Sequence, residues 1–132
     1  MSEVSKMRRM IIQDFFDQHG KYAPDAYEFV TRAVIEQVEA LEQHRHLTAL
    51  EVLQNLRRQL DAEFGCLASA VLAEWKINCA SDIGEIIYDL IEMHILSAAE
   101  DDKRSDFDID FNLQEQPVYR KKSASAEVPK ID

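Results

Sequence analysis

The residues with the clearest chemical potential are four carboxylates spaced three or four positions apart. They are Asp82, Glu85, Asp89 and Glu92. A helix places residues with this spacing on one face, so the four carboxylates are predicted to form a single acidic stripe. Such a stripe can bind a basic protein partner, or a cation if further ligands converge on it.

A metal site is the weaker interpretation of this stripe. Helical bundles that bind metals through carboxylates use Glu-x-x-His pairs on facing helices, and no such pair occurs in the chain. Glu42 and His46, with His44 between them, could share an ion, but histidines also interact favourably with the negative end of a helix. The acidic run at residues 106–110 lacks the glycine and the final glutamate of a calcium loop. We therefore expect no metal and no other cofactor.

Groups suited to nucleophilic catalysis are present but isolated. Cys66, Cys79 and four histidines occur without a glycine-flanked nucleophile or a phosphate-binding loop, and the chain has only three glycines. The cysteines lack a metal-binding spacing, and a helix between them would hold them too far apart for a disulfide. We expect free thiols, no catalytic residues and a protein that is not an enzyme.

The charge balance argues against nucleic acid as a partner. Lysine and arginine total 15 against 25 for aspartate and glutamate, which gives a net charge of −10. Binding to phosphates depends on clustered cations. The one compact basic run is Arg120, Lys121 and Lys122, in a polar segment where we expect it to be solvated.

The N-terminus carries basic residues before a short apolar run. Gln13, Asp14 and Asp17 interrupt this run before a signal peptide or a membrane span could form. We expect no membrane association and a cytoplasmic location.

The helix that must carry the acidic stripe is predicted over residues 81–96, with Ser81 as its N-cap. Its opposite side is apolar at helical spacing, which predicts that it packs at the centre of the domain. The apolar positions are Ile83, Ile86, Ile87, Leu90, Ile91 and Ile95. Further helices are predicted over residues 3–18, 24–43, 48–64 and 67–75, and Thr48 with Glu51 forms a capping box for the third of these. A chain of 132 residues fits one domain, which we assign to residues 1–113.

Beyond residue 96 the apolar spacing changes from helical to alternating. Phe107, Ile109, Phe111 and Leu113 alternate with polar residues, which is typical of a half-buried strand. We expect this strand to form a β-hairpin over residues 95–113, and residues 114–132 to form a disordered tail. The predicted fold is therefore mainly α, with about five helices and a C-terminal β-hairpin.

Helices followed by a hairpin also match a winged-helix arrangement. In a nucleic-acid-binding winged helix the acidic stripe would face the phosphates, so this role is the least favoured. The leading hypothesis is a non-enzymatic module that binds a protein partner through the acidic stripe. The main alternative is a small-ligand binder or enzyme with a cleft near Trp75, Tyr27 and Tyr88.

The first helix carries an apolar stripe that includes Met7, Met10 and Phe15. We expect this stripe to pack on the next helix. If instead these three residues are exposed, the sequence predicts a homodimer through the first helix.

Four stretches of the chain resemble a known family. They are YAPDAYEFV at residues 22–30, RHLTALEVLQNLR at 45–57, FGCLASAVLAEW at 64–75 and DIGEIIYDLIEMHIL at 82–96. Together they are similar to an uncharacterised family of short bacterial proteins found mainly in planctomycetes and verrucomicrobia, over about residues 10–113. The resemblance implies a bacterial cytosolic domain. That family has no assigned activity, so the resemblance assigns no site residue.

Overall fold

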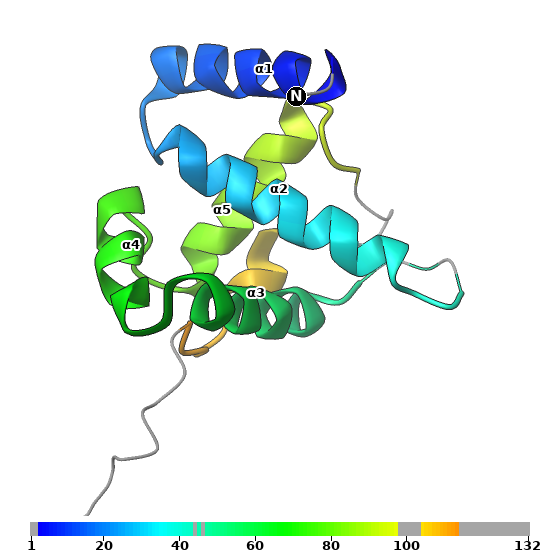
Figure 1. Cartoon of the computed structure of the whole chain (residues 1–132), viewed down its shortest axis with the longest axis vertical. Helices are drawn as coiled ribbons and strands as arrows, with labels where there is room; N and C mark the ends of the chain where they lie inside the picture. Colours follow the sequence, from blue (N-terminus) through cyan, green and yellow to red (C-terminus); the bar gives the residue numbers. More distant parts are fainter. Residues whose placement is uncertain (1–2, 44, 46, 98–103, 114–132) are drawn as a thin grey trace, which may run out of the picture.

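The chain folds into a mainly helical domain, in which two crossing helices form a central layer and the others pack around them (Figure 1). The computed structural model describes residues 3–43, 45, 47–97 and 104–113. The helices are α1 (Glu3–His19), α2 (Pro24–Glu39), α3 (Ala49–Phe64), α4 (Ala68–Trp75) and α5 (Ala80–Glu92), with short 3₁₀ helices η1 (Gly65–Leu67) and η2 (Arg104–Phe107). The central pair is α2 and α5, and Figure 1 shows α1 and α3 at opposite ends of it.

The apolar side of α5 forms the centre of the core, as its spacing predicted. Ile83, Ile86 and Leu90 are at most 2% exposed. The facing helix α2 contributes the buried alanines Ala26 and Ala33. These residues belong to one continuous cluster of buried side chains, in which α5 packs against α2.

Helix α1 covers one side of α2. Ile12 is fully buried between them, and the Phe15 ring meets the edge of the Tyr27 ring at a centroid distance of 6.0 Å. Arg8 and Arg9 extend toward α2, where Arg8 Nε lies 3.3 Å from Glu28 and Arg9 Nη1 lies 3.0 Å from Asp25. Gly20 ends the helix with a positive φ of 62°, a conformation that glycine adopts without strain.

Helix α3 begins with the capping box that its sequence predicted. Thr48 accepts a hydrogen bond from the Glu51 amide at 3.2 Å, and the Glu51 carboxylate accepts one from the Thr48 amide at 2.9 Å. The buried face of α3 consists of Leu53, Leu56 and Leu60, which pack beneath α2. Helix α2 ends at Glu39, earlier than the predicted residue 43.

An aromatic cluster joins α4 to α2 and α3. The Trp75 ring lies 5.3 Å from Phe29 and 5.8 Å from Phe64, measured between centroids. Trp75 is 8% exposed, so the cluster is part of the core. Helix α4 ends at Lys76, which adopts a left-handed conformation with φ of 67°.

The prediction of a C-terminal β-hairpin was wrong. Within the described part of the chain no residue is in a strand, and residues 104–107 form the 3₁₀ helix η2. Residues 108–113 continue without regular structure. Of the turn predicted at residues 100–105, residues 104 and 105 belong to η2 and the others lie outside the described residues, as does the predicted tail at 114–132.

The reason lies in the backbone at the end of α5. The amides of Ile95 and Leu96, which the hairpin needed for pairing, donate instead to the Leu90 carbonyl at 2.9 and 3.2 Å. His94 reverses the chain with a positive φ of 63°. These bonds close the C-terminus of the helix, so the Ile95 and Leu96 amides at the start of the predicted first strand are not available to a partner strand.

Residues 104–113 pack on the helices through separate contacts. Phe107 is 6% exposed and lies over Gly84 of α5, where an added Cβ would lie 2.7 Å from the Phe107 Cβ. Phe111 packs beneath the Arg57 guanidinium, 4.7 Å from its ring centroid, and Leu113 is buried. Ile109 is 43% exposed, so the alternating residues do not form one buried face.

None of the helices in the described part of the chain has the length and apolar character needed to cross a bilayer.

Candidate functional site

The acidic stripe of α5 is largely engaged within the protein. Asp82 accepts a hydrogen bond from the Tyr22 hydroxyl at 2.8 Å, and its Oδ2 also accepts from the Asn78 and Cys79 amides at 2.7 and 3.2 Å. Asp82 therefore stabilises the N-terminus of α5, which begins at Ala80 with Cys79 as the N-cap. The predicted N-cap, Ser81, lies instead in the first turn.

The next two carboxylates of the stripe also have partners. Glu85 forms an ion pair with Lys21 in the connector between α1 and α2, and Asp89 accepts a hydrogen bond from the Tyr27 hydroxyl at 2.8 Å. Burial raises the pKa of both Tyr22 and Tyr27 above the ordinary value, and the hydrogen bonds to Asp82 and Asp89 raise each pKa further. The two tyrosines therefore stay protonated donors.

Only Glu92 among the four predicted carboxylates is exposed. The sequence correctly implied that the four residues share one side of a helix, but most of that side faces α2 and the connector before it. The missed partners are Tyr22 and Tyr27. A buried tyrosine needs an acceptor for its hydroxyl. This requirement could have suggested from the sequence that the two tyrosines pair with carboxylates.

An apolar groove of about 440 Å³ lies between α2, α5 and the segment around the start of α3. We call this feature the apolar groove. Its two long walls are Val34, Ile35 and Val38 of α2, and Ile87, Tyr88 and Ile91 of α5. Its ends are formed by Leu47, Val52, Ile95, Leu96 and Phe107. Most of these side chains are half-buried, so the floor of the groove is accessible from solvent.

Carboxylates lie at the edge of the apolar groove. Glu39 and Asp106 line it directly and are exposed. Glu92 follows Tyr88 by one turn of α5, on the neighbouring part of the helix surface. The exposed member of the predicted stripe thus lies one helical turn from the lining without being part of it.

Among the described residues that line the groove, Arg45 is the cation, and it is held by Glu51. Its guanidinium donates two hydrogen bonds to the Glu51 carboxylate, at 2.9 and 2.7 Å. These bonds, together with the one from the Thr48 amide, lower the pKa of Glu51 to about 2. Arg45 therefore contributes little net positive charge to the groove.

The three aromatics predicted to share a cleft lie in different environments. Trp75 packs with Phe29 and Phe64, Tyr27 is 1% exposed, and Tyr88 lines the apolar groove. No pocket described in the structure is lined by all three residues, because Trp75 lines a separate, more open depression of about 540 Å³.

The candidate catalytic and metal-binding groups remain scattered. Cys66 and Cys79 are exposed free thiols, and His19 stacks against Phe15 with a centroid distance of 4.3 Å. His44 and His46, proposed above with Glu42, lie outside the described residues. The described residues include no group of three or more histidines, cysteines or carboxylates arranged to hold a metal ion.

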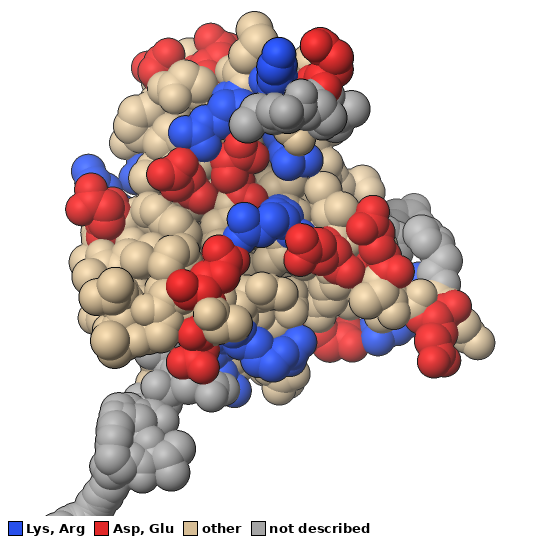
Figure 2. Space-filling model, in the orientation of Figure 1, with Lys and Arg blue, Asp and Glu red and all other residues tan. Residues whose placement is uncertain are grey.

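The charges on the face shown in Figure 2 alternate in sign, with Lys and Arg side chains interspersed among Asp and Glu.

Comparison with protein-family models, with curated proteins and with solved structures finds no match to this chain. The resemblance to the bacterial family therefore stays a prediction.

Proposed function

We propose that this protein is a non-enzymatic, cytoplasmic protein-interaction module. The observation that carries the proposal is the apolar groove, whose walls come from the two central helices. The apolar groove supplies the apolar contact area for a partner. Of the acidic stripe that suggested a basic partner, Glu92 supplies negative charge near the edge of the groove. Exposed thiols such as Cys66 and Cys79 persist in the reducing conditions of a cytoplasm.

The size and shape of the groove favour a helix of a partner protein as its occupant. A cavity of about 150 Å³ holds one benzene ring, so 440 Å³ corresponds to roughly three apolar side chains. An amphipathic helix presents about this number of anchors at i, i+3 or i+4, and i+7. The two walls are themselves helices, between which such anchors can interdigitate.

The charge at the groove favours a partner helix with lysine or arginine beside its apolar anchors. Glu39 is exposed in the lining and Glu92 is exposed one turn beyond Tyr88, whereas Arg45 is paired with Glu51. A basic helix would therefore gain attraction at the edge while its apolar side chains fill the centre. Such attraction raises the association rate and falls with ionic strength.

Isothermal titration calorimetry with designed peptides tests the proposal. The probe is an amphipathic peptide of about 15 residues, with leucines at helical spacing and lysines on both sides of them. A peptide with glutamates in place of the lysines and a scrambled peptide of the same composition are the comparisons. We expect saturable binding of the lysine peptide, weaker binding of the glutamate peptide and none of the scrambled one.

Matched variants of the protein locate the binding. Ile91→Lys places a charge in the groove, whereas Leu67→Lys makes the same type of change at an exposed apolar residue outside the groove lining. Ile91→Lys should abolish binding while Leu67→Lys leaves it unchanged, and circular dichroism checks that both variants fold. Equal binding by the two variants, or by all three peptides, would contradict the proposal. Dodecanoate binding in the groove without peptide binding would overturn it in favour of a small apolar ligand.

A further inference from the structure

The outer face of α1 is a second apolar surface, separate from the apolar groove. Met7 is 59% exposed, Met10 is 70% exposed and Ile11 is 40% exposed. These residues follow one another at i, i+3 and i+4, so they lie on one side of the helix. Ile12 lies on the side of α1 that packs on the core, and Phe15, one turn after Ile11, is half-buried at the border between the two sides.

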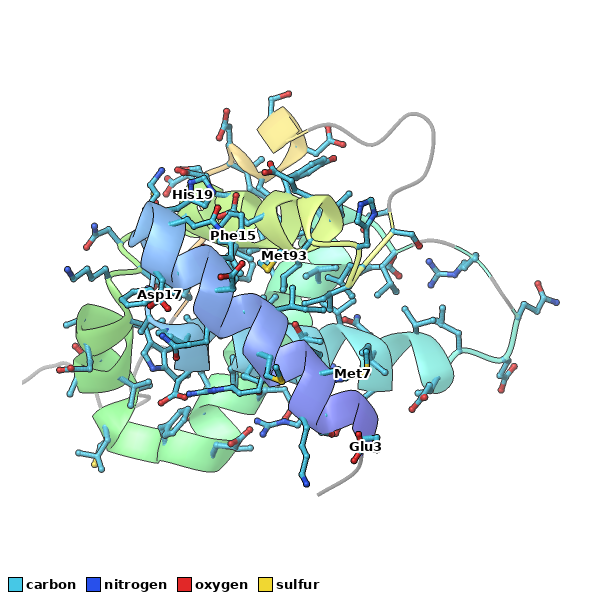
Figure 3. All side chains as sticks on the ribbon, turned by 90° about the horizontal axis from the view of Figure 1, so that it is seen from above. Glu3, Met7, Phe15, Asp17, His19 and Met93 are labelled. Carbon is cyan, nitrogen blue, oxygen red and sulfur yellow. The ribbon has the colours of Figure 1, made fainter. Side chains whose placement is uncertain are left out.

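The charges of this outer face are distributed unevenly along the helix. Lys6 lies one turn before Met10, and Asp14 lies one turn after it. Both are exposed, and Asp14 also accepts a hydrogen bond from Gln18 at 3.1 Å. The other cations of α1, Arg8 and Arg9, pair with carboxylates of α2. Figure 3 looks down on α1, with Glu3 near one end and His19 at the other.

We propose that α1 binds α1 of a second copy of this chain in an antiparallel pair centred on Met10. An antiparallel pair with a two-fold axis at Met10 brings residue i of one copy opposite residue 20−i of the other. Lys6 of each copy then lies opposite Asp14 of its partner, so that the face is complementary to itself in charge. The two Met10 side chains meet at the axis, with Met7 beside them.

Like charges at the ends of the helices do not prevent this arrangement. Glu3 and Asp17 are seven residues from Met10, or about 10 Å along the axis. Two helices that cross at roughly 50° have separated by that distance, so the repulsion between these residues is screened. Lys6 and Asp14 lie nearer the crossing point and within reach of each other. The contact area is small, so the dimer is weak and depends on protein concentration.

Sedimentation velocity with the full chain tests this inference at concentrations up to about 1 mM, the range in which small contacts associate. The mass should rise from 15.2 kDa toward twice that value as the concentration increases. Met10→Lys should give a monomer throughout, because it brings two like charges together at the axis. Leu67→Lys is the matched control, since Leu67 is 63% exposed on another surface, and it should dimerise like the wild type.

Charge exchange tests the proposed orientation. Lys6→Glu and Asp14→Lys should each weaken the dimer several-fold, and the double variant should restore it because the two opposite charges only change places. A wild-type mass of 15.2 kDa at every concentration would overturn the dimer. A double variant no stronger than the single variants would overturn the antiparallel pairing. Neither result bears on the apolar groove, because Met10, Lys6 and Asp14 do not line it.

Discussion

Tyr27 of α2 donates its hydroxyl to Asp89 of α5 at 2.8 Å, across the interface of the two central helices. The tyrosine is 1% exposed. Its hydroxyl forms a polar contact in an otherwise apolar interface. One turn earlier on α5, Glu85 pairs with Lys21. Nearly one further turn back, Asp82 accepts a hydrogen bond from the Tyr22 hydroxyl. The acidic stripe thereby fixes the position of α5 against α2 and its preceding connector.

The first prediction concerns the contribution of this hydrogen bond to stability. Tyr27→Phe should lower the free energy of unfolding by about 1.5–3 kcal/mol, the range for a hydrogen bond to a charged group. Asp89→Asn should also destabilise, and a double-mutant cycle of the two should show positive coupling. Glu92→Gln, which removes a carboxylate from the exposed end of the same stripe, should change stability by less than about 0.5 kcal/mol. Urea denaturation measures all four, and equal effects of Asp89→Asn and Glu92→Gln would refute the assignment.

A second prediction concerns alkaline pH. The pKa values of Tyr22 and Tyr27 are raised in the folded protein, so the unfolded state loses these protons first. Stability should be full below the unfolded tyrosine pKa of about 10 and should fall as the pH rises above it. In an absorbance titration of the four tyrosines, two should ionise only together with unfolding. The Tyr22→Phe/Tyr27→Phe variant should lack this late component, and its persistence there would contradict the prediction.

The close approach of Gly84 and Phe107 gives a third prediction. Glycine to alanine within a helix ordinarily stabilises by about 0.5–1 kcal/mol. Gly84→Ala should instead destabilise by about 1–3 kcal/mol, because the new Cβ overlaps Phe107 and forces residues 104–113 to move. In a Phe107→Gly background, which removes the Cβ that the new methyl group would meet, the same change should be neutral or stabilising. Thermal unfolding of the four proteins tests this reversal, and a stabilising effect in the wild-type background would show that the contact is not tight.

A fourth prediction concerns Lys76, where a substitution by glycine should raise the stability of the protein. It ends α4 in a left-handed conformation, with φ of 67° and ψ of 31°, which L-residues adopt at a cost. Lys76→Gly should therefore stabilise the protein by up to about 1 kcal/mol. The matched control is Lys6→Gly, at the fourth residue of α1, which should destabilise by a similar amount. A lower melting temperature for Lys76→Gly would argue against the left-handed end of α4.

The helices were predictable because each carries a local sequence pattern that is typical of a helix and of no other element. The isoleucines of α5 recur at helical spacing, and Thr48 with Glu51 specifies where α3 begins. The alternation at Phe107 and Ile109 lacked this property, because an alternating pattern produces a strand only where a neighbouring strand can pair with it. The amides that would have paired with it close the end of α5 instead.

The candidate site was less predictable than the fold. Spacing correctly implied that Asp82, Glu85 and Asp89 lie together, but it does not determine which neighbouring helix faces them. The apolar groove depends on Val38 of α2 and Ile91 of α5, which are distant in sequence and meet only through packing. Both belong to apolar positions that a sequence pattern assigns to the core, and only the packed structure shows that they remain half-exposed.

The central claim is that the apolar groove binds a basic amphipathic helix of a partner protein. The most direct measurement is a backbone amide NMR titration of the full-length protein with the lysine-flanked amphipathic peptide. The account predicts saturable shifts around Val34, Val38, Tyr88 and Ile91, with little change around Leu67 or along α1. Shifts confined to other surfaces, or no saturable shifts at peptide concentrations approaching about 1 mM, would contradict it.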